Sequence, residues 1–153
     1  MNTPRFTIRA YGLLLHEGAV LVSDEHVQGR AITKFPGGAL EYGEGLRDCL
    51  VREVREEVGV EALDVRHFHT TEVFQRSAFH TDPVQVVAVY FTFRTARPEA
   101  IPVVRAPFGG GPGADQVFRW LPLAGTPEDA FSLPLDRAVW RLLRHRAGWP
   151  PSA

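Results

Sequence analysis

The sequence predicts a mixed α/β fold in which one early helix is inserted between strands. Two observations predict it: runs of β-branched and apolar residues recur along the chain, and helical patterns interrupt them in the middle and near the end. The chain has 153 residues, which is the length of one ordinary domain and enough to bury a core. We therefore expect a single domain over residues 1–153.

The strand predictions rest on β-branched and apolar runs bounded by turn residues. Residues 105–115 (RAPFGGGPGAD) are expected to form a loop, as are the polar residues 24–30. Residues 39–45 (ALEYGEG), which follow two glycines, have too much glycine for regular structure. The apolar run at 84–95 gives the strongest strand, which we expect to be central. The predicted strands cover residues 7–15, 19–23, 31–35, 65–74, 84–95 and 116–121.

Two helices are predicted. Leucine or valine recurs every four residues from Leu46 to Val58, and Gly59 stands where a C-terminal cap belongs. The amphipathic residues 134–146 are expected to form a closing helix.

The composition excludes several function classes. Hydrophobic residues make up 44% and charged residues 23%, and the net charge is −1 with His neutral, so there is no overall attraction to nucleic acid or anionic membrane. No segment approaches 18 apolar residues, and the start of the chain is polar. The single cysteine, Cys49, allows no internal disulfide. We expect a cytoplasmic protein without a nucleic-acid or membrane partner.

Three glutamates crowd into the last turns of the first helix. At about 100° per residue, Glu53 and Glu57 lie one turn apart, within roughly 20° of Leu46 and therefore at the margin of the apolar stripe. Glu56 lies one step to the side. The outward side is expected to carry three charged residues, Asp48, Arg52 and Arg55.

Carboxylates gathered in this way repel one another unless a cation neutralises them. Mg²⁺ and Mn²⁺ prefer oxygen ligands, so the cluster indicates a divalent-metal site. The alternative is a surface helix whose Arg–Glu pairs only keep it soluble. Gly37 and Gly38, between a strand and this helix, favour the metal site because glycine lets the backbone approach a ligand closely.

These residues resemble the Nudix box. Gly38 is followed after five residues by Glu44, and after seven more by Arg-Glu-Val-Arg-Glu-Glu-Val-Gly-Val at 52–60. That order matches glycine, five residues, glutamate, seven residues, then Arg-Glu-aliphatic-x-Glu-Glu-x-Gly-aliphatic, with every fixed position filled. The resemblance implies an α/β/α sandwich around a mixed β-sheet. It also implies hydrolysis of a nucleoside diphosphate that is linked to another group.

The resemblance assigns roles by position. It implies that Glu53, Glu56 and Glu57 bind Mg²⁺ or Mn²⁺, with the Gly38 carbonyl as a further ligand. Glu53 or a water near it would act as base. The remaining box residues implied are Arg52, which would orient a carboxylate, Glu44, which would brace the loop, and Gly59, which would end the helix.

Residues outside the box give weaker candidates. Lys34, the only lysine, could meet a substrate phosphate or pair with a neighbouring acid, and Gly37 could contact the substrate through its backbone. Glu99 is the first candidate for an additional acid in the site. The remaining candidate acids are Glu72 and Asp115; the histidines weighed as metal ligands are His67 and His69, expected on one strand face, and His80; and the aromatic residues weighed for base stacking are Phe74, Phe79, Tyr90 and Phe108.

The expected activity is metal-dependent hydrolysis of the pyrophosphate linkage in a small nucleotide, either a nucleoside triphosphate or a nucleotide sugar. ADP-ribose stays open as a substrate, although Gln75 stands where the ADP-ribose type tends to carry proline. A nucleotide sensor that does not hydrolyse is a second class, which the intact box disfavours. An isomerase of the isopentenyl diphosphate type is a third, but Cys49 lies inside the helix. A homodimer is possible.

Overall fold

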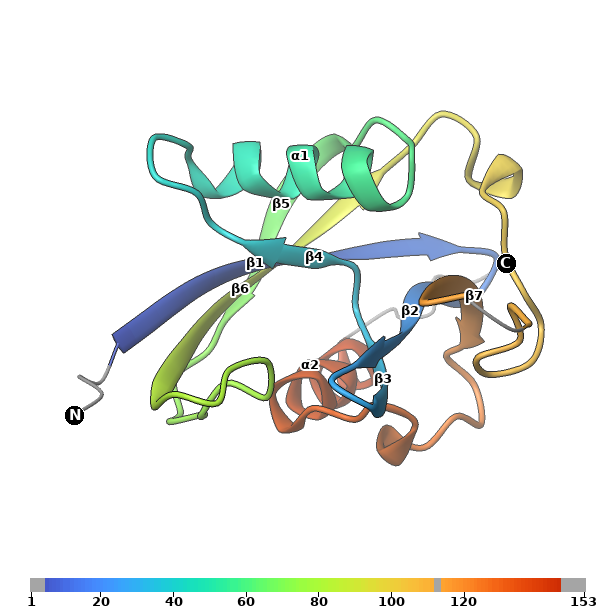
Figure 1. Ribbon diagram of the computed structural model, residues 1–153. Helices are drawn as coiled ribbons and strands as arrows, with labels where there is room; N and C mark the ends of the chain where they lie inside the picture. The colour runs from blue at the N-terminus through green and yellow to red at the C-terminus, as the bar shows by residue number, and fades with distance from the viewer. Residues whose placement is uncertain (1–4, 112–113, 147–153) are drawn as a thin grey trace. The chain divides into compact units, whose positions relative to one another are not determined.

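The computed structural model describes residues 5–111 and 114–146 and groups them into two compact units. The first unit contains residues 5–13 and 36–101, and the second contains 14–35, 102–111 and 114–146. In chain order the elements are β1 (Arg5–His16), β2 (Ala19–Val27), β3 (Arg30–Lys34), β4 (Gly37–Ala39), α1 (Leu46–Glu57), β5 (Leu63–Thr70), β6 (Val84–Arg94), a 3₁₀ turn at Pro98–Ala100, β7 (Gln116–Pro122), a second 3₁₀ turn at Glu128–Ala130 and α2 (Pro134–His145) (Figure 1). The single domain expected over residues 1–153 stays a prediction.

The first unit places α1 against strands (Figure 1). Within it, β6 lies between β1 and β5, and β4 pairs antiparallel with β1 through Ala10–Gly38 and Tyr11–Gly37. A side chain at Gly12 would overlap Phe93 of β6 and touch Leu50 of α1, so this strand face is the one that packs on the helix. The opposite face of β1 carries Tyr11, because successive side chains alternate along a strand.

Burial in the first unit follows this division. Leu50 and Val54 of α1 and Phe93 of β6 are almost fully buried on the helix side. On the opposite face Tyr11 and Tyr90 are buried with ring centroids 5.4 Å apart. Both faces of β6 are therefore covered, which agrees with its long apolar run and with its expected central position.

In the second unit β2 pairs antiparallel with both β3 and β7. Phe131 and Trp140 of the C-terminal part are fully buried, and the Phe131 ring lies 4.6 Å from that of Phe35. The Trp140 indole donates a hydrogen bond to the Thr126 carbonyl at 3.2 Å, so the polar edge of this core residue is satisfied.

A buried polar network crosses the strands of the second unit. Asp24 of β2 accepts hydrogen bonds from the Thr33 hydroxyl at 2.7 Å, from the Phe108 backbone at 3.0 Å and from Arg119 Nε at 2.6 Å. Asp24 is 1% exposed, so these partners take the place of water around its charge.

Most expected elements are confirmed to within one or two residues, and three expectations were wrong. The loop over 24–30 was wrong because β2 continues to Val27, with the charge of Asp24 satisfied inside the sheet. The irregular segment over 39–45 was wrong at its first residue, because Ala39 pairs with Arg9 of β1 at the end of β4. The strand over 65–74 starts earlier and ends sooner, as β5. No helix within the described residues has the length and apolar character needed to cross a membrane.

Candidate functional site

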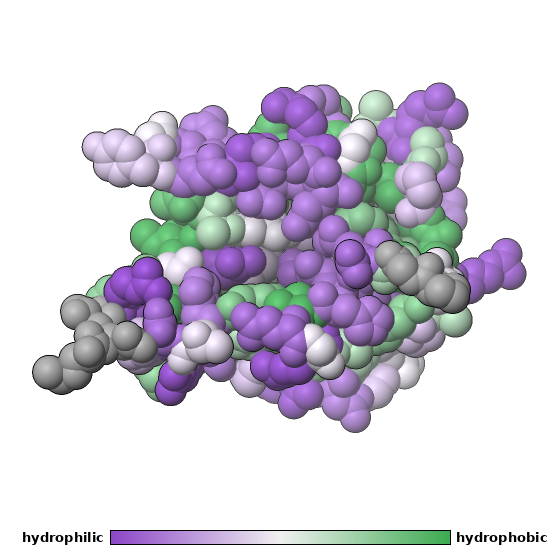
Figure 2. All heavy atoms as spheres, in the orientation of Figure 1, coloured by the Kyte–Doolittle hydropathy of each residue, from purple (hydrophilic) through white to green (hydrophobic). Residues whose placement is uncertain are grey.

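The glutamates of α1 differ in burial as the helical geometry predicts. The Glu53 side chain is 14% exposed and that of Glu56 is 59% exposed, while Glu57 is half-buried. Glu53 and Glu57 therefore lie at the edge of the packed face, and Glu56 faces solvent. Hydrophilic residues gather along α1 and the loop before it in Figure 2.

Arg52 joins the acids of α1 to the preceding loop. Its Nη1 donates to Glu53 Oε1 at 2.9 Å and to Glu56 Oε2 at 3.2 Å. Its Nε and Nη2 donate to the two oxygens of Glu44, at 2.9 and 2.6 Å, and Nη2 also donates to the Ala39 carbonyl. The expected outward direction of Arg52 was wrong, because its long side chain folds over the loop; the other two residues expected outward, Asp48 and Arg55, are exposed.

The contacts of Arg52 shift the pKa of Glu44 and the pKa of Arg52 itself. The paired guanidinium, together with a hydrogen bond from the Glu41 backbone, lowers the pKa of Glu44 to about 2. Hydrogen bonds to Glu44 and Glu53 raise the pKa of Arg52 beyond its ordinary value. Both groups stay charged at neutral pH, so the loop and α1 are joined by a permanent ion pair.

Gly38 lies directly beneath the Glu53 carboxylate. A Cβ at Gly38 would come within 2.5 Å of Glu53 Cδ and Oε1, so only glycine leaves this acid in place. The neighbouring Gly37 has φ +146° and donates its N–H to Glu57 Oε2 at 3.3 Å. In β4, Gly38 thus lies next to the Glu53 carboxylate, and Gly37 lies next to the Glu57 carboxylate. At the far end of α1, Gly59 has φ +80° and its N–H bonds to the Val54 carbonyl, which ends the helix as expected.

The oxygens around Gly38 have the chemistry that a hard divalent cation prefers. They are the Gly38 carbonyl and the side chains of Glu53, Glu56 and Glu57. Within residues 5–111 and 114–146, no three acidic, His or Cys side chains already stand together as a cation site. Arg52 Nη1 lies in hydrogen-bond contact with both Glu53 and Glu56. The chemistry of this donor set fits a divalent metal.

Cys49 is buried in α1 and unsuited to catalysis. Burial first, and then the neighbouring Glu44, raise the pKa of its thiol to about 12. Its Sγ points at the Gly38 and Ala39 carbonyls, at 3.8 and 3.5 Å. A thiol this hard to ionise is a poor nucleophile at neutral pH.

Arg9 of β1 was missed by the sequence reasoning. It pairs in register with Ala39, the residue after Gly38, and its Nε donates to the Tyr11 hydroxyl at 2.6 Å. Its guanidinium carbon lies 4.9 Å above the centroid of the Phe79 ring. Strand alternation does place Arg9 and Tyr11 on one face, but their nearness to β4 depends on a pairing that the sequence does not reveal.

Lys34 forms the ion pair that was weighed as the alternative to phosphate binding. Its side chain is 2% exposed, and Nζ lies 3.1 Å from Glu25 Oε2 and donates to the Phe35 carbonyl at 3.1 Å. A buried ammonium with these partners would need to leave them before it met a ligand. The substrate contact of Lys34 stays a prediction that this environment disfavours.

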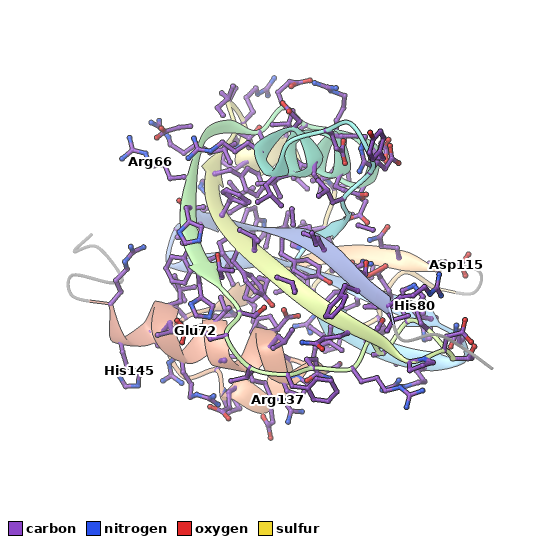
Figure 3. All side chains as sticks on the ribbon, turned by 90° about the vertical axis from the view of Figure 1, so that its left-hand side faces the viewer. Arg66, Glu72, His80, Asp115, Arg137 and His145 are labelled. Atoms are coloured by element: carbon purple, nitrogen blue, oxygen red, sulfur yellow. The ribbon has the colours of Figure 1, made fainter. Side chains whose placement is uncertain are left out.

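The acids considered outside the box lie at the surface. Glu99, in the 3₁₀ turn at Pro98–Ala100, is 61% exposed and lies 3.7 Å from Arg97. Glu72 follows β5 and Asp115 precedes β7, and both are exposed (Figure 3). Within the part of the chain that the structure describes, none of the three forms a hydrogen bond or ion pair with the glutamates of α1, so their roles stay predictions.

The histidines do not share a strand face as expected. A register shift in β5 pairs His67 with Phe91 and His69 with Tyr90, which are adjacent residues of β6 and point to opposite faces. His67 also shares a hydrogen bond with the Thr70 hydroxyl, and His80 shares one with the Ser77 hydroxyl (Figure 3). The expectation of a common face was wrong because the strand contains this irregularity.

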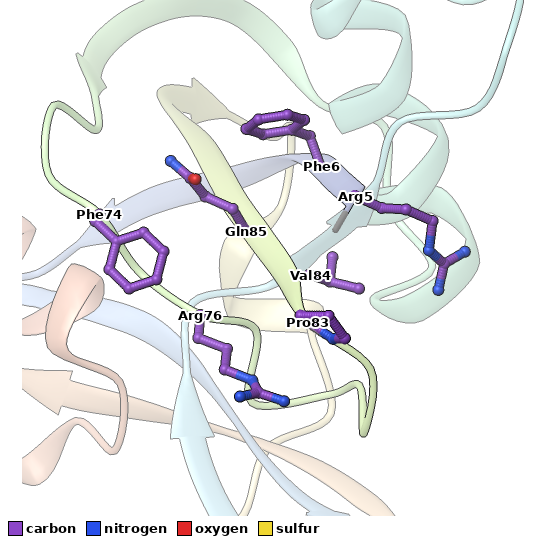
Figure 4. A pocket seen from close by; sticks show the side chains of 7 residues that line it. All are labelled: Arg5, Phe6, Phe74, Arg76, Pro83, Val84 and Gln85. Atoms are coloured by element: carbon purple, nitrogen blue, oxygen red, sulfur yellow. The ribbon is translucent and has the colours of Figure 1, made fainter. Parts of the chain in front are cut away.

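A shallow pocket lies at the start of β1 and β6. It holds about 170 Å³ and is open to solvent (Figure 4). Phe6 and Phe74 are both largely exposed beside it. Of the other aromatic residues weighed for base stacking, Tyr90 is fully buried and Phe108 lies 5.3 Å from His26. The residues that line the pocket are Arg5, Phe6, Phe74, Arg76, Pro83, Val84 and Gln85.

Comparison with known proteins matches the NUDIX domain model to residues 5–139. The NAD-capped RNA hydrolase NudC of Pseudomonas aeruginosa, found in two strains, is 37% identical over 75 residues. That alignment covers 44% of this chain and 27% of NudC, so the chain corresponds to about a quarter of the length of this relative.

Solved structures share the fold. The MutT NUDIX hydrolase of Burkholderia pseudomallei matches with a TM-score of 0.65 at 17% identity, over 89% of this chain and 96% of that one. The ORF135 protein of E. coli matches with a TM-score of 0.60 at 21% identity, over 97% of this chain and 96% of that one. These likenesses show the fold, and they confirm the expected α/β/α sandwich class.

Proposed function

The chain belongs to the NUDIX domain family, and on that premise we propose that it is a divalent-metal-dependent pyrophosphohydrolase of small nucleotides. The observation that carries the proposal is the Glu53 carboxylate, which lies over Gly38 and is tied through Arg52 to Glu44 and Glu56. The proposed substrate is a nucleoside triphosphate or a nucleotide sugar.

The proposed metal ligands are Glu53, Glu56 and Glu57, with the Gly38 carbonyl. When bound, Mg²⁺ or Mn²⁺ would neutralise the diphosphate oxygens and lower the pKa of a water nucleophile. Glu53 is held in place by Arg52 and could accept a proton from such a water. Arg52 donates hydrogen bonds to Glu53 and Glu56, and Glu44 holds Arg52 against the loop.

The proposal is tested by phosphate and pyrophosphate release from a substrate panel with Mg²⁺ or Mn²⁺. The panel holds nucleoside triphosphates, oxidised dGTP, ADP-ribose, nucleotide sugars and dinucleoside polyphosphates. Glu53→Gln and Glu57→Gln are expected to reduce turnover by about 100-fold or more, because each removes a charge from the site. Glu61→Gln is the matched control, since Glu61 is exposed and pairs with Arg55.

Turnover of one substrate class that is lost in both site variants and kept in Glu61→Gln would support the proposal. Turnover that survives Glu53→Gln would contradict the proposed role of this acid. If the wild type binds nucleotide with either metal but hydrolyses nothing on the panel, the chain is better described as a nucleotide sensor.

The similarity to NudC adds two compounds to the panel. A NAD cap contains a pyrophosphate linkage between two nucleosides, so NAD-capped RNA and free NAD should be compared. The net charge of −1 offers no overall attraction to an RNA chain. We therefore expect any activity on the cap to extend to free NAD. The cytoplasmic location and the homodimer remain proposals.

A further inference from the structure

Arg9 has three side-chain contacts on the strand face beside β4. Its Nε–H bonds to the Tyr11 hydroxyl at 2.6 Å, and its guanidinium carbon lies 4.9 Å from the centroid of the Phe79 ring and 5.6 Å from that of Tyr11. Two aromatic rings and one hydrogen bond thus fix the plane of a side chain that is otherwise flexible.

Most of the hydrogen-bonding capacity of Arg9 is unused. A guanidinium has five N–H donors, of which Arg9 uses the one on Nε. Within residues 5–111 and 114–146, neither Nη atom donates a hydrogen bond and neither forms an ion pair. The two Nη groups at the outer edge of the Arg9 guanidinium are therefore available to bind a ligand.

Arg9 also lies within electrostatic range of the proposed metal ligands. Burial alone would lower its pKa, but the Tyr11 hydroxyl and the charges of Glu53 and Glu57 outweigh this and raise it. Arg9 is therefore a cation at any working pH. Among the described residues, Arg9 influences both carboxylates without a hydrogen bond or ion pair to either.

We infer that Arg9 binds a phosphate group of the substrate, with its two Nη atoms as donors and Phe79 as the platform beneath it. Planar guanidinium groups suit phosphate because two parallel N–H bonds can form at once. A diphosphate that contacts metal ions on Glu53 and Glu57 could extend one phosphate to Arg9. This inference rests on the proposed function, and it adds a substrate-binding residue outside the box.

The test measures two ligands separately on the whole chain. Mn²⁺ binding is followed by the loss of the free Mn²⁺ EPR signal, and pyrophosphate binding in the presence of saturating Mn²⁺ is followed by calorimetry. Arg9→Ala is expected to weaken pyrophosphate binding by about 10- to 100-fold. It should leave Mn²⁺ affinity unchanged or tighter, because it removes a positive charge near Glu53 and Glu57.

Three further variants separate binding from structure. Arg9→Lys keeps the charge but not the paired donors, so it should recover only part of the lost affinity. Phe79→Leu keeps Arg9 and removes the ring beneath it, and several-fold weaker pyrophosphate binding is expected; this variant also serves if Arg9→Ala does not fold. Arg66→Ala is the control, since Arg66 is an exposed strand arginine paired with Asp64 at 3.0 Å.

Equal pyrophosphate affinity in the wild type and Arg9→Ala overturns the inference, even if the chain hydrolyses nucleotides. A parallel loss of Mn²⁺ and pyrophosphate binding also overturns it, because Arg9 would then only shape the site. Absence of pyrophosphate binding to the Mn²⁺-loaded wild type overturns it as well. Binding that depends on Arg9, without hydrolysis of any substrate, supports the inference while contradicting the proposed reaction.

Discussion

At the scale of single residues, Arg52 connects more of the candidate site than any carboxylate does. It donates to Glu44, Glu53 and Glu56 and to the Ala39 carbonyl. A metal that binds Glu53 and Glu56 must therefore compete with, or rearrange around, a guanidinium already placed between them. Metal binding and the position of Arg52 should be coupled.

The Glu44–Arg52 pair should make stability depend on pH in the acid range. The pKa of Glu44 falls from 4.5 to about 2 on folding, so its contribution is complete above pH 4.5 and is lost as pH falls toward 2. Glu44→Gln should lower Tm at pH 6–7, and the difference from wild type should shrink toward pH 2–3. Scanning calorimetry from pH 2 to 7 measures this. Glu72→Gln, which alters an exposed acid outside the network, should parallel the wild type throughout.

Sequence reasoning anticipated the direction of Glu53 and Glu57, because the helical repeat alone sets the angle at which a side chain leaves the axis. It misjudged Arg52 for a physical reason: a long side chain can bend away from the direction of its Cα. Arg9 could not be found because Phe79 and β4 come near it only through long-range contacts that the sequence does not reveal.

At the scale of elements, β4 is the shortest strand in the described part of the chain, and it contributes two glycines to the candidate site. It has three residues, two of which are glycines, so its sequence carries no alternation that would predict a strand. The longer strands were predictable because their apolar residues are needed to cover a core. The extension of β2 was not, since the buried Asp24 looks like a loop residue until its partners are known.

The two glycines of β4 should respond differently to alanine. A Cβ at Gly38 would meet the movable end of Glu53, so Gly38→Ala should cut metal-dependent turnover about tenfold or more with little change in Tm. A Cβ at Gly37 would overlap the Ala10 carbonyl, and its φ of +146° strains other residues, so Gly37→Ala should cost about 1–3 kcal/mol or more. Thermal melts and turnover assays on both variants decide this. Wild-type turnover in a folded Gly38→Ala protein would contradict the placement of Glu53.

At the scale of the whole molecule, the two units are stabilised by different chemistry. In the first unit the polar network joins α1 to its loop near the surface. In the second unit Asp24 and Arg119 form a buried pair, with Arg119 8% exposed. Loss of one partner from a buried pair is expensive because the other charge is left without compensation.

Asp24→Asn should therefore be among the most destabilising single changes that keep side-chain size. We expect a loss of about 3–5 kcal/mol, which corresponds to a fall in Tm of roughly 6–20 °C for a chain of this length. Tryptophan fluorescence suits the measurement, because Trp120 and Trp140 both lie in the second unit. Asp64→Asn removes half of an exposed pair with Arg66 and should stay within about 0.5 kcal/mol of wild type. Equal melting of the two variants would show that the Asp24 network contributes little.

The two units alternate along the chain, so the ribosome finishes the residues of one unit before those of the other. The chain passes from one unit to the other after residues 13, 35 and 101. The first unit can close once residue 101 has left the ribosome, whereas β2 and β3 of the second unit must wait for β7 and α2. At roughly 5–20 residues per second, that wait lasts on the order of 5 to 20 seconds. During this time the edge of β2 that later pairs with β7 is open to other strands, so a chaperone that covered this edge would protect the chain from mispairing.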